Sequence, residues 1–289
     1  MSPVGHPAAR GFDESGVKVG LEPVEEPKWL EIDELFSSEI EVKKILYKNK
    51  RQEVYQETSS SFDSQEELLN LLRKHINKFY PGHLKQNEPK RNKNLSPLET
   101  ASLLVQEDLV LMVPQKEKFL LGAASLCAPS NWSLKEKFNK SLLMLHKDVP
   151  TYSSKIGSRV NKIFINLPEE RIFQRFNWSI YETPILFQPA ESKSYVERSK
   201  QINQENAGDK LFIRVERQTI RKLPITQSIV FTIRVHVDPL SSIKKDISLL
   251  QDLKKAIVNL DVSMKEYKSI DQINQPLIDW LSFQERSLS

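Results

Sequence analysis

Two stretches of alternating apolar and polar residues, 211–220 and 229–237, limit the folds open to this chain. A period of two is the repeat of a β-strand whose two faces lie in different surroundings. The residues between the stretches, 221–228, include Pro224, a residue type that is excluded from the interior of a central strand. The pattern predicts a long antiparallel hairpin that turns near Ile225.

The position of the turn predicts which side chains share a face of the hairpin. A turn at Ile225 places Arg214 opposite His236 and Glu216 opposite Arg234, and the parity of the two strands then agrees on both faces. The expected result is one polar stripe, made of Arg214, Glu216, Gln218, Thr232, Arg234 and His236.

Two interpretations of this stripe stay open. It is either an outer face with cross-strand ion pairs, or a site for a small charged ligand. In the second case Glu216 holds an ammonium group and an arginine holds a carboxylate. The alternation places Arg217 on the face opposite Arg214 and Arg234.

Shorter patterns predict the elements around the hairpin. Further strands are expected over residues 103–113, 119–127 and 176–181. Helices are expected over residues 64–79, 134–146, 153–167, 241–260 and near 273–283, with a less regular helical pattern over 28–47. Because strands and helices do not alternate along the chain, we predict an α+β fold. Its antiparallel sheet carries helices on one side and is wrapped by helices from both ends of the chain.

The length and composition predict one domain with a polar extension. The chain has 289 residues, of which 39% are hydrophobic, and this is enough for a sizeable core. Residues 1–27 are polar and interrupted by prolines, so we expect a flexible N-terminal arm. Residues 28–289 are expected to form a single domain.

Several function classes are disfavoured by the composition. The 42 Lys+Arg are interleaved with 38 Asp+Glu, so no nucleic-acid-binding surface is expected. None of the eight glycines belongs to a phosphate-binding or nucleophile-elbow motif. The single cysteine, Cys127, excludes an internal disulfide and a cysteine-ligated zinc or iron–sulfur site within this chain. No apolar run reaches the roughly 20 residues that span a bilayer, and no secretory signal is seen, so we expect a cytoplasmic protein.

His146 is the histidine best placed for chemistry. It lies four, eight and twelve residues after Leu142, Phe138 and Leu134, so it ends one apolar face of the expected helix 134–146. One interpretation is a half-buried core histidine near a helix C-terminus. The other is a metal ligand, and a lone histidine in apolar surroundings favours haem over zinc.

A longer block connects the chain to a known family. Residues 214–224 (RVERQTIRKLP) and 231–234 (FTIR) resemble a signature of the haem-dependent oxidative N-demethylase family, which includes the haem subunit of dimethylamine monooxygenase. Shorter blocks agree in order over nearly the whole chain, at 19–23, 29–33, 106–109, 127–132, 146–150 and 177–179.

The resemblance implies a PAS-like fold that binds haem b. It also implies a reaction in which reduced haem activates O₂ and a small secondary amine such as dimethylamine loses a methyl group as formaldehyde. Electrons are then expected from separate flavin and iron–sulfur (ferredoxin-type) partners, which fits a chain without cofactor motifs of its own. The alternative is a non-catalytic PAS-like module that binds haem or another ligand as a sensor or interaction domain.

The resemblance also implies roles for individual residues. It places the iron ligand on His146 and makes Glu216 the partner of an ammonium substrate. Arg214 is expected at the catalytic site, and Trp132, Arg217 and Arg234 are expected in contact with the cofactor. The chain departs from the family pattern at two positions, where Asn131 replaces a histidine and His236 replaces an aromatic residue.

Overall fold

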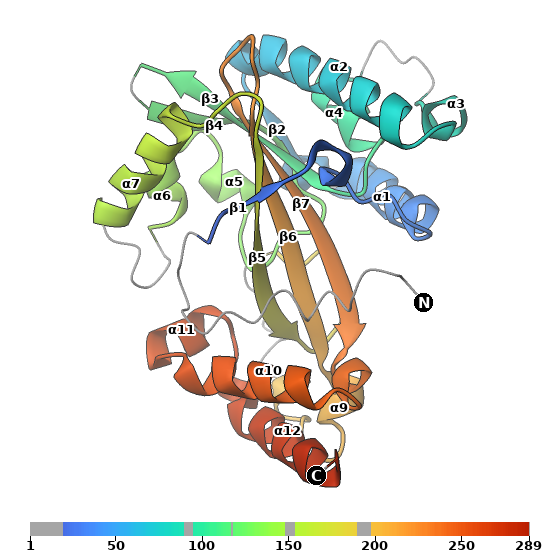
Figure 1. Cartoon of the computed structure of the whole chain (residues 1–289), viewed down its shortest axis with the longest axis vertical. Coiled ribbons are helices and arrows are strands. Elements are labelled where there is room, and N and C mark those ends of the chain that lie inside the picture. The colour runs from blue at the N-terminus through green and yellow to red at the C-terminus, as the bar shows by residue number, and fades with distance from the viewer. Residues whose placement is uncertain (1–19, 90–94, 117, 148–153, 190–197, 289) are drawn as a thin grey trace.

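A long antiparallel sheet forms the centre of the structure, a computed structural model that describes residues 20–89, 95–116, 118–147, 154–189 and 198–288 (Figure 1). For residues 154–159 only the backbone is described. Seven strands lie in the order β1-β5-β6-β7-β3-β4-β2, and each neighbouring pair is antiparallel. They are β1 (Glu22–Val24), β2 (Tyr55–Glu57), β3 (Asp108–Gln115), β4 (Lys118–Ser125), β5 (Ile172–Tyr181), β6 (Phe212–Lys222) and β7 (Ile229–Pro239). The predicted α+β class is confirmed.

The hairpin predicted from the alternating residues is β6 and β7, but its register differs by one residue from the prediction. Arg217, and not Glu216, lies opposite Arg234. Leu223 donates its backbone N–H to the carbonyl of Ser228 across the turn, at 2.8 Å, so the turn is centred after residue 225 instead of on it. A shift of one residue moves a strand's side chains to the other face. The expected polar stripe is therefore divided between the two faces of the sheet.

We name the two faces of the sheet after the helices that cover them. The α1 face is covered by α1 (Phe36–Val54), α2 (Phe62–Phe79) and α4 (Pro97–Ser102). The α7 face is covered by α5 (Leu134–Lys137), α6 (Leu142–Leu145) and α7 (Ser154–Ile165). Helices lie on both faces and not on one side only, because apolar side chains of the strands point both ways. Ile229 and Val230 are successive residues, and both are fully buried.

The remaining short elements connect these layers or border them. They are η2 (Glu26–Lys28), η3 (Ser59–Ser61), α3 (His83–Asn87), α9 (Ala207–Lys210), η4 (Leu240–Ile243) and η5 (Asp271–Ile273).

The C-terminal helices form a second layer of packing at the far end of the long strands. β5, β6 and β7 extend between the upper part of the molecule and the C-terminal helices α10 (Ile247–Asn259), α11 (Val262–Tyr267) and α12 (Asn274–Leu288) (Figure 1). Trp178 and Val215 on the α1 face contribute to a core that these helices complete. The expected helices over residues 241–260 and 273–283 correspond to α10 and α12.

The expected helix 134–146 is wrong as a single element. The chain leaves the helix after α5, and the backbone of residues 138–141 pairs with β4 before α6 begins. Asn139 donates to the carbonyl of Leu121 at 3.1 Å, and Leu121 donates to the carbonyl of Lys140 at 3.0 Å. These strand-like hydrogen bonds replace the helical ones, so His146 follows a single turn of helix and not the end of a long apolar face.

The N-terminal part of the chain is tied to the sheet where it is described. Residues 1–19 of the expected arm lie outside the described residues. The described part of the arm contains β1 and the start of η2, and β1 forms the edge of the sheet beside β5. Among the helices that the structure describes, none is both long enough and apolar enough to cross a membrane.

Candidate functional site

Glu216 lies at the centre of a polar cluster on the α7 face. Its side chain is buried, with 7% of the residue exposed. Gln218 donates to one carboxylate oxygen at 2.8 Å, and Asn177 on β5 donates to the same oxygen at 3.4 Å. Ser130 donates its hydroxyl proton to the other oxygen. All three donors are neutral, and no lysine or arginine among the described residues forms an ion pair with this carboxylate.

Two cations lie behind these neutral donors. Arg214 donates from Nε to the hydroxyl of Ser130 at 2.9 Å, and from Nη2 to the carbonyl of Ala128 at 2.7 Å. Lys268 donates to the amide oxygen of Asn177 at 3.2 Å. Each cation therefore orients a neutral group that in turn contacts Glu216. Neither cation contacts the carboxylate directly.

A third cation, Arg175, faces the same cluster from β5. Arg175 lies opposite Gln218 in the β5–β6 register, on the α7 face. Burial lowers the pKa of its guanidinium, and the charge of Glu216 acts in the opposite direction. Within the part of the chain that the structure describes, this guanidinium has no hydrogen bond or ion pair. It is thus a part-buried cation that is available to an anionic group.

Burial also changes the protonation of other groups in the cluster. It lowers the pKa of Lys268 to about 8, where the charge of Glu216 opposes the change and that of Arg175 adds to it. Burial raises the pKa of Tyr181 to about 12. The ring of Tyr181 lies 5.7 Å from the guanidinium carbon of Arg214. Among these groups, Lys268 is the one that titrates near neutral pH.

His146 and Trp132 lie on the same side of the sheet as this cluster. His146 follows α6, and its Nδ1 lies 3.0 Å from the carbonyl of Leu142. A carbonyl only accepts, so Nδ1 carries the proton and Nε2 carries the lone pair. Burial lowers the pKa of His146, and the charge of Arg175 contributes to this. The imidazole is therefore neutral at pH 7. Trp132 packs, half-buried, against the core of the α7 face.

Arg217 and Arg234 lie on the other face, contrary to the expectation that Arg234 shares a face with Glu216. Arg217 donates to the backbone carbonyl of Trp29 at 3.1 Å and lies 3.4 Å from the Glu31 carboxylate. Arg234 donates to Glu39 and to Asp33, at 2.8 Å each. Both guanidiniums hold the N-terminal segment against the α1 face, so the sheet separates them from the polar cluster.

The two positions that depart from the family pattern also have defined contacts. His236 lies on the α1 face, where its Nε2 is 2.8 Å from the carboxylate of Glu31. Asn131 has a left-handed backbone, with φ of 56°, and its amide approaches the carbonyl of Tyr267 at 3.5 Å. Asn131 therefore borders the polar cluster, whereas His236 belongs to the opposite face.

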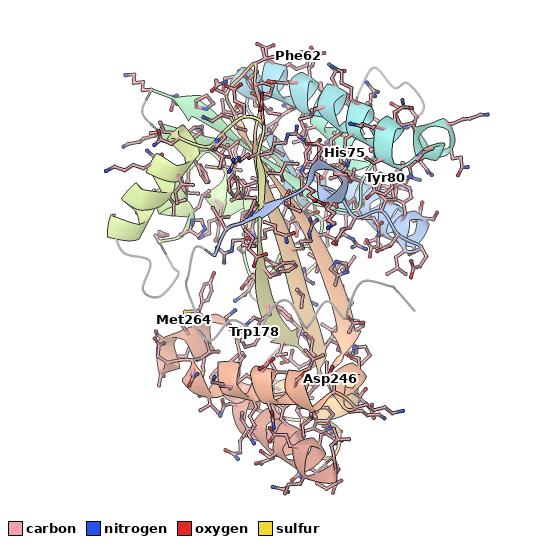
Figure 2. All side chains as sticks on the ribbon, in the orientation of Figure 1. Phe62, His75, Tyr80, Trp178, Asp246 and Met264 are labelled. Carbon is pink, nitrogen blue, oxygen red and sulfur yellow. The ribbon has the colours of Figure 1, made fainter. Side chains whose placement is uncertain are left out.

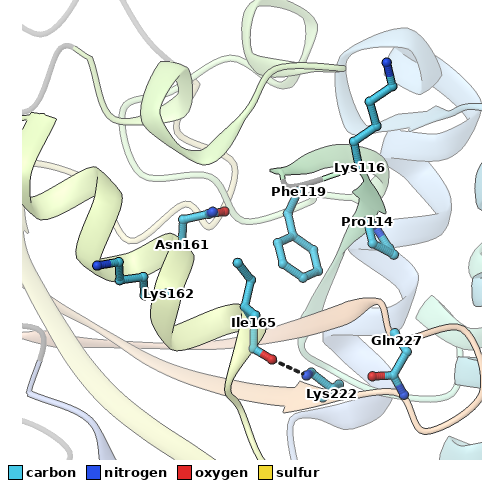
Figure 3. Close-up of a pocket in the computed structure, with 8 residues that line it drawn as sticks. All are labelled: Pro114, Lys116, Phe119, Asn161, Lys162, Ile165, Lys222 and Gln227. Atoms are coloured by element: carbon cyan, nitrogen blue, oxygen red, sulfur yellow. Dashed lines mark hydrogen bonds between the residues drawn. The ribbon is translucent and has the colours of Figure 1, made fainter.

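A cavity of about 590 Å³ lies elsewhere, between α7 and the β3–β4 hairpin (Figure 3). Its lining includes Lys116, Lys162, Lys222 and Phe119. Lys222 donates to the carbonyl of Ile165 at 2.8 Å, at the last residue of α7, which is a favourable place for a cation. None of the residues expected to carry chemistry lines this cavity.

Several members of the polar cluster were not assigned a role from the sequence. Arg175 and Asn177 are two residues apart on β5, as Arg214 and Glu216 are on β6. This spacing is the sequence signal that places each pair on one face of its strand. The sequence predicts a strand from residue 176, which excludes Arg175, whereas β5 begins at Ile172. Lys268 follows a short helix near the C-terminus, and no local pattern relates it to β5.

The fold is an α+β sheet with a buried cluster of charged and polar side chains on one face. Comparison with protein families gives a more specific result. A model of the family described as haem-dependent oxidative N-demethylase, alpha subunit-like, matches residues 20–278. The chain belongs to this family, as its sequence blocks indicate. It is therefore a haem-dependent oxidoreductase of the oxidative N-demethylase type, and the description as an alpha subunit implies an enzyme with further subunits.

Proposed function

We propose that this chain is the haem-binding subunit of a cytoplasmic monooxygenase that demethylates a small secondary amine. With dimethylamine, one O₂, two electrons and two protons, the products are methylamine, formaldehyde and water. The proposal includes a PAS-like haem b site on the α7 face, and electrons from flavin and iron–sulfur partners. When bound, haem supplies the activation of O₂.

The charges of the polar cluster fit haem b. Haem carries two propionate groups, and the cluster sets three cations, Arg175, Arg214 and Lys268, against the carboxylate of Glu216. Arg175 is the natural partner for a propionate, because its guanidinium contacts no other described polar group. A part-buried cation gains more from such a partner than a solvated one does.

His146 fits the role of axial ligand through its hydrogen bond to Leu142. Ligating histidines usually donate their second ring N–H to a carbonyl or a carboxylate, which fixes the tautomer and the orientation of the ring. The contact between Nδ1 and the Leu142 carbonyl has this form. Burial keeps the ring neutral, as a metal ligand must be. Trp132 is then an apolar wall residue beside the macrocycle.

Glu216 carries the amine-binding part of the proposal. A secondary amine is protonated in water at pH 7 and needs an anionic partner in a buried site. Glu216 accepts from three neutral donors and from no cation, so its charge is available to an ammonium group. Arg214 acts through Ser130 and is a positioning residue for this carboxylate. Arg217 and Arg234 have no part in the site, because they hold the N-terminal segment on the other face.

The test measures product formation by the protein reconstituted with haem b. Electrons are supplied by NADPH through a ferredoxin reductase and a ferredoxin, and dimethylamine is added in air. The proposal predicts formaldehyde and methylamine in equal amounts, with O₂ uptake that depends on dimethylamine. Haem binding without formaldehyde, although the ferredoxin reduces the iron, would contradict the proposed reaction and favour a ligand-sensing role.

A further inference from the structure

Lys268, which follows the C-terminal helix α11, brings a cation from this part of the chain to the polar cluster. Met264 of α11 packs in the same core as Trp178 of β5 (Figure 2). The Lys268 ammonium lies 4.7 Å from the ring centroid of Trp178 and donates to the Trp178 carbonyl at 2.6 Å. It also donates to the side chain of Asn177 at 3.2 Å. The Lys268 side chain therefore extends from the C-terminal helices past β5 and reaches Asn177 on the α7 face.

The contact with Asn177 determines which way that amide points. An ammonium group only donates, so it selects the amide oxygen of Asn177. The amide nitrogen is then directed at Glu216, which accepts from it at 3.4 Å. Without Lys268 the Asn177 amide keeps only its contact with Glu216 and loses the second contact that fixes its orientation. The amide is then free to rotate away from Glu216, and the carboxylate is held less firmly.

We infer that Lys268 is a positioning residue for the amine site, which acts on Glu216 through Asn177 and couples the C-terminal helices to substrate binding. The inference rests on the proposed role of Glu216. A positioning role and a simple charge effect predict opposite changes in amine affinity when Lys268 is removed. A cation near the site repels an ammonium substrate, so its removal alone would tighten binding. Loss of a positioning contact weakens binding.

The experiment compares Lys268→Met with wild type in the haem-loaded protein. The readout is the dissociation constant of dimethylamine, measured by calorimetry at pH 7. We expect an increase of at least threefold, and recovery toward the wild-type value in Lys268→Arg, which keeps a charged donor. Lys265→Met, at a half-buried position of α11 like that of Lys268, is the matched control and is expected to bind as wild type does.

A second measurement does not depend on haem. Burial lowers the pKa of Lys268 to about 8, and the ammonium lies against Trp178. The tryptophan fluorescence of the cofactor-free protein is therefore expected to change with a midpoint near pH 8. This change should be present in wild type and in Lys265→Met, and absent in Lys268→Met. If Lys268→Met fails to fold, Asn177→Leu replaces it. This variant removes the hydrogen bond between Lys268 and Asn177 from the side of β5.

The outcomes separate this inference from the proposed function. Unchanged or tighter dimethylamine binding in Lys268→Met would overturn the positioning role while leaving the amine site in place. If wild type binds haem but not dimethylamine, the proposed substrate fails first, and the coupling of Lys268 to that substrate fails with it. The fluorescence change near pH 8 then reports whether Lys268 occupies the position described.

Discussion

At the scale of single residues, the site depends on which groups contact the Glu216 carboxylate. The carboxylate is buried but contacts only neutral donors, and the cations Arg214 and Lys268 lie one group further away. A direct ion pair would neutralise the carboxylate and close it to a cationic ligand. Distant cations stabilise a buried negative charge and leave the carboxylate without a direct cationic partner.

Replacement of Glu216 by glutamine tests this arrangement. Glu216→Gln keeps the shape of the side chain but removes its charge. A hydrogen bond to a charged group contributes about 1.5–3 kcal/mol, so the dissociation constant of dimethylamine should rise about tenfold or more. The measurement is calorimetric titration of the haem-loaded variant. Glu22→Gln, an exposed position on β1, is the control. Equal amine affinity in Glu216→Gln and wild type would remove Glu216 from the site.

At the scale of elements, β6 and β7 carry a different function on each face. On the α1 face, Arg217 and Arg234 hold the segment of residues 28–39 to the sheet through carbonyl and carboxylate groups. On the α7 face, Arg214 and Glu216 belong to the polar cluster. The alternation of a strand lets neighbouring residues serve a structural contact on one face and the proposed binding site on the other.

Loss of Arg234 should destabilise the fold without a direct effect on the cluster. Arg234→Met leaves the carboxylates of Asp33 and Glu39 without their cation, and loss of one partner from a buried ion pair costs about 3–5 kcal/mol. Asp33 and Glu39 are partly exposed, so we expect about 3 kcal/mol from urea unfolding at pH 7. Arg73→Met, which breaks an exposed pair with Glu88, should cost about 0–1 kcal/mol. Equal losses in the two variants would contradict this account.

The loss caused by Arg234→Met should depend on pH. Burial acts to raise the pKa of Asp33, but the hydrogen bond from Gln106 and the charge of Arg234 outweigh it, and the pKa is lowered. A carboxyl with a lowered pKa in the folded state stabilises the fold above its unfolded pKa, and this is lost as pH falls through the folded value. The difference between wild type and Arg234→Met should therefore shrink below about pH 4.

The sequence predicts the hairpin but not the partition of its residues between the faces. The period of two identifies β6 and β7, because half-buried strands require it. The centre of a turn of six residues is not fixed by that period, and a shift of one residue reverses the faces. This is why Arg234 was expected beside Glu216 and is found beside Arg217. Similarly, no pattern in residues 134–146 shows that residues 138–141 pair with β4.

At the scale of the whole molecule, the site is assembled from distant parts of the chain. The family signature in β6 contributes Glu216 and Arg214, and it was recognisable because it is continuous in sequence. Ser130 comes from the loop after β4, Asn177 from β5 and Lys268 from the C-terminal unit. These contacts arise from tertiary packing, which sequence periodicity does not contain. The continuous signature therefore identified the family, which the local patterns alone did not.

The central claim is that the chain binds haem on the α7 face through His146, and the absorption spectrum of the haem-loaded protein tests it most directly. Wild type is compared with His146→Ala and with His83→Ala. The control is well matched, because His83 is also part-buried and its ring lies 3.1 Å from a carbonyl, that of Leu104. We predict one haem per chain with a sharp Soret band in wild type and in His83→Ala, and loss of that band in His146→Ala. An unchanged Soret band in His146→Ala would contradict the account.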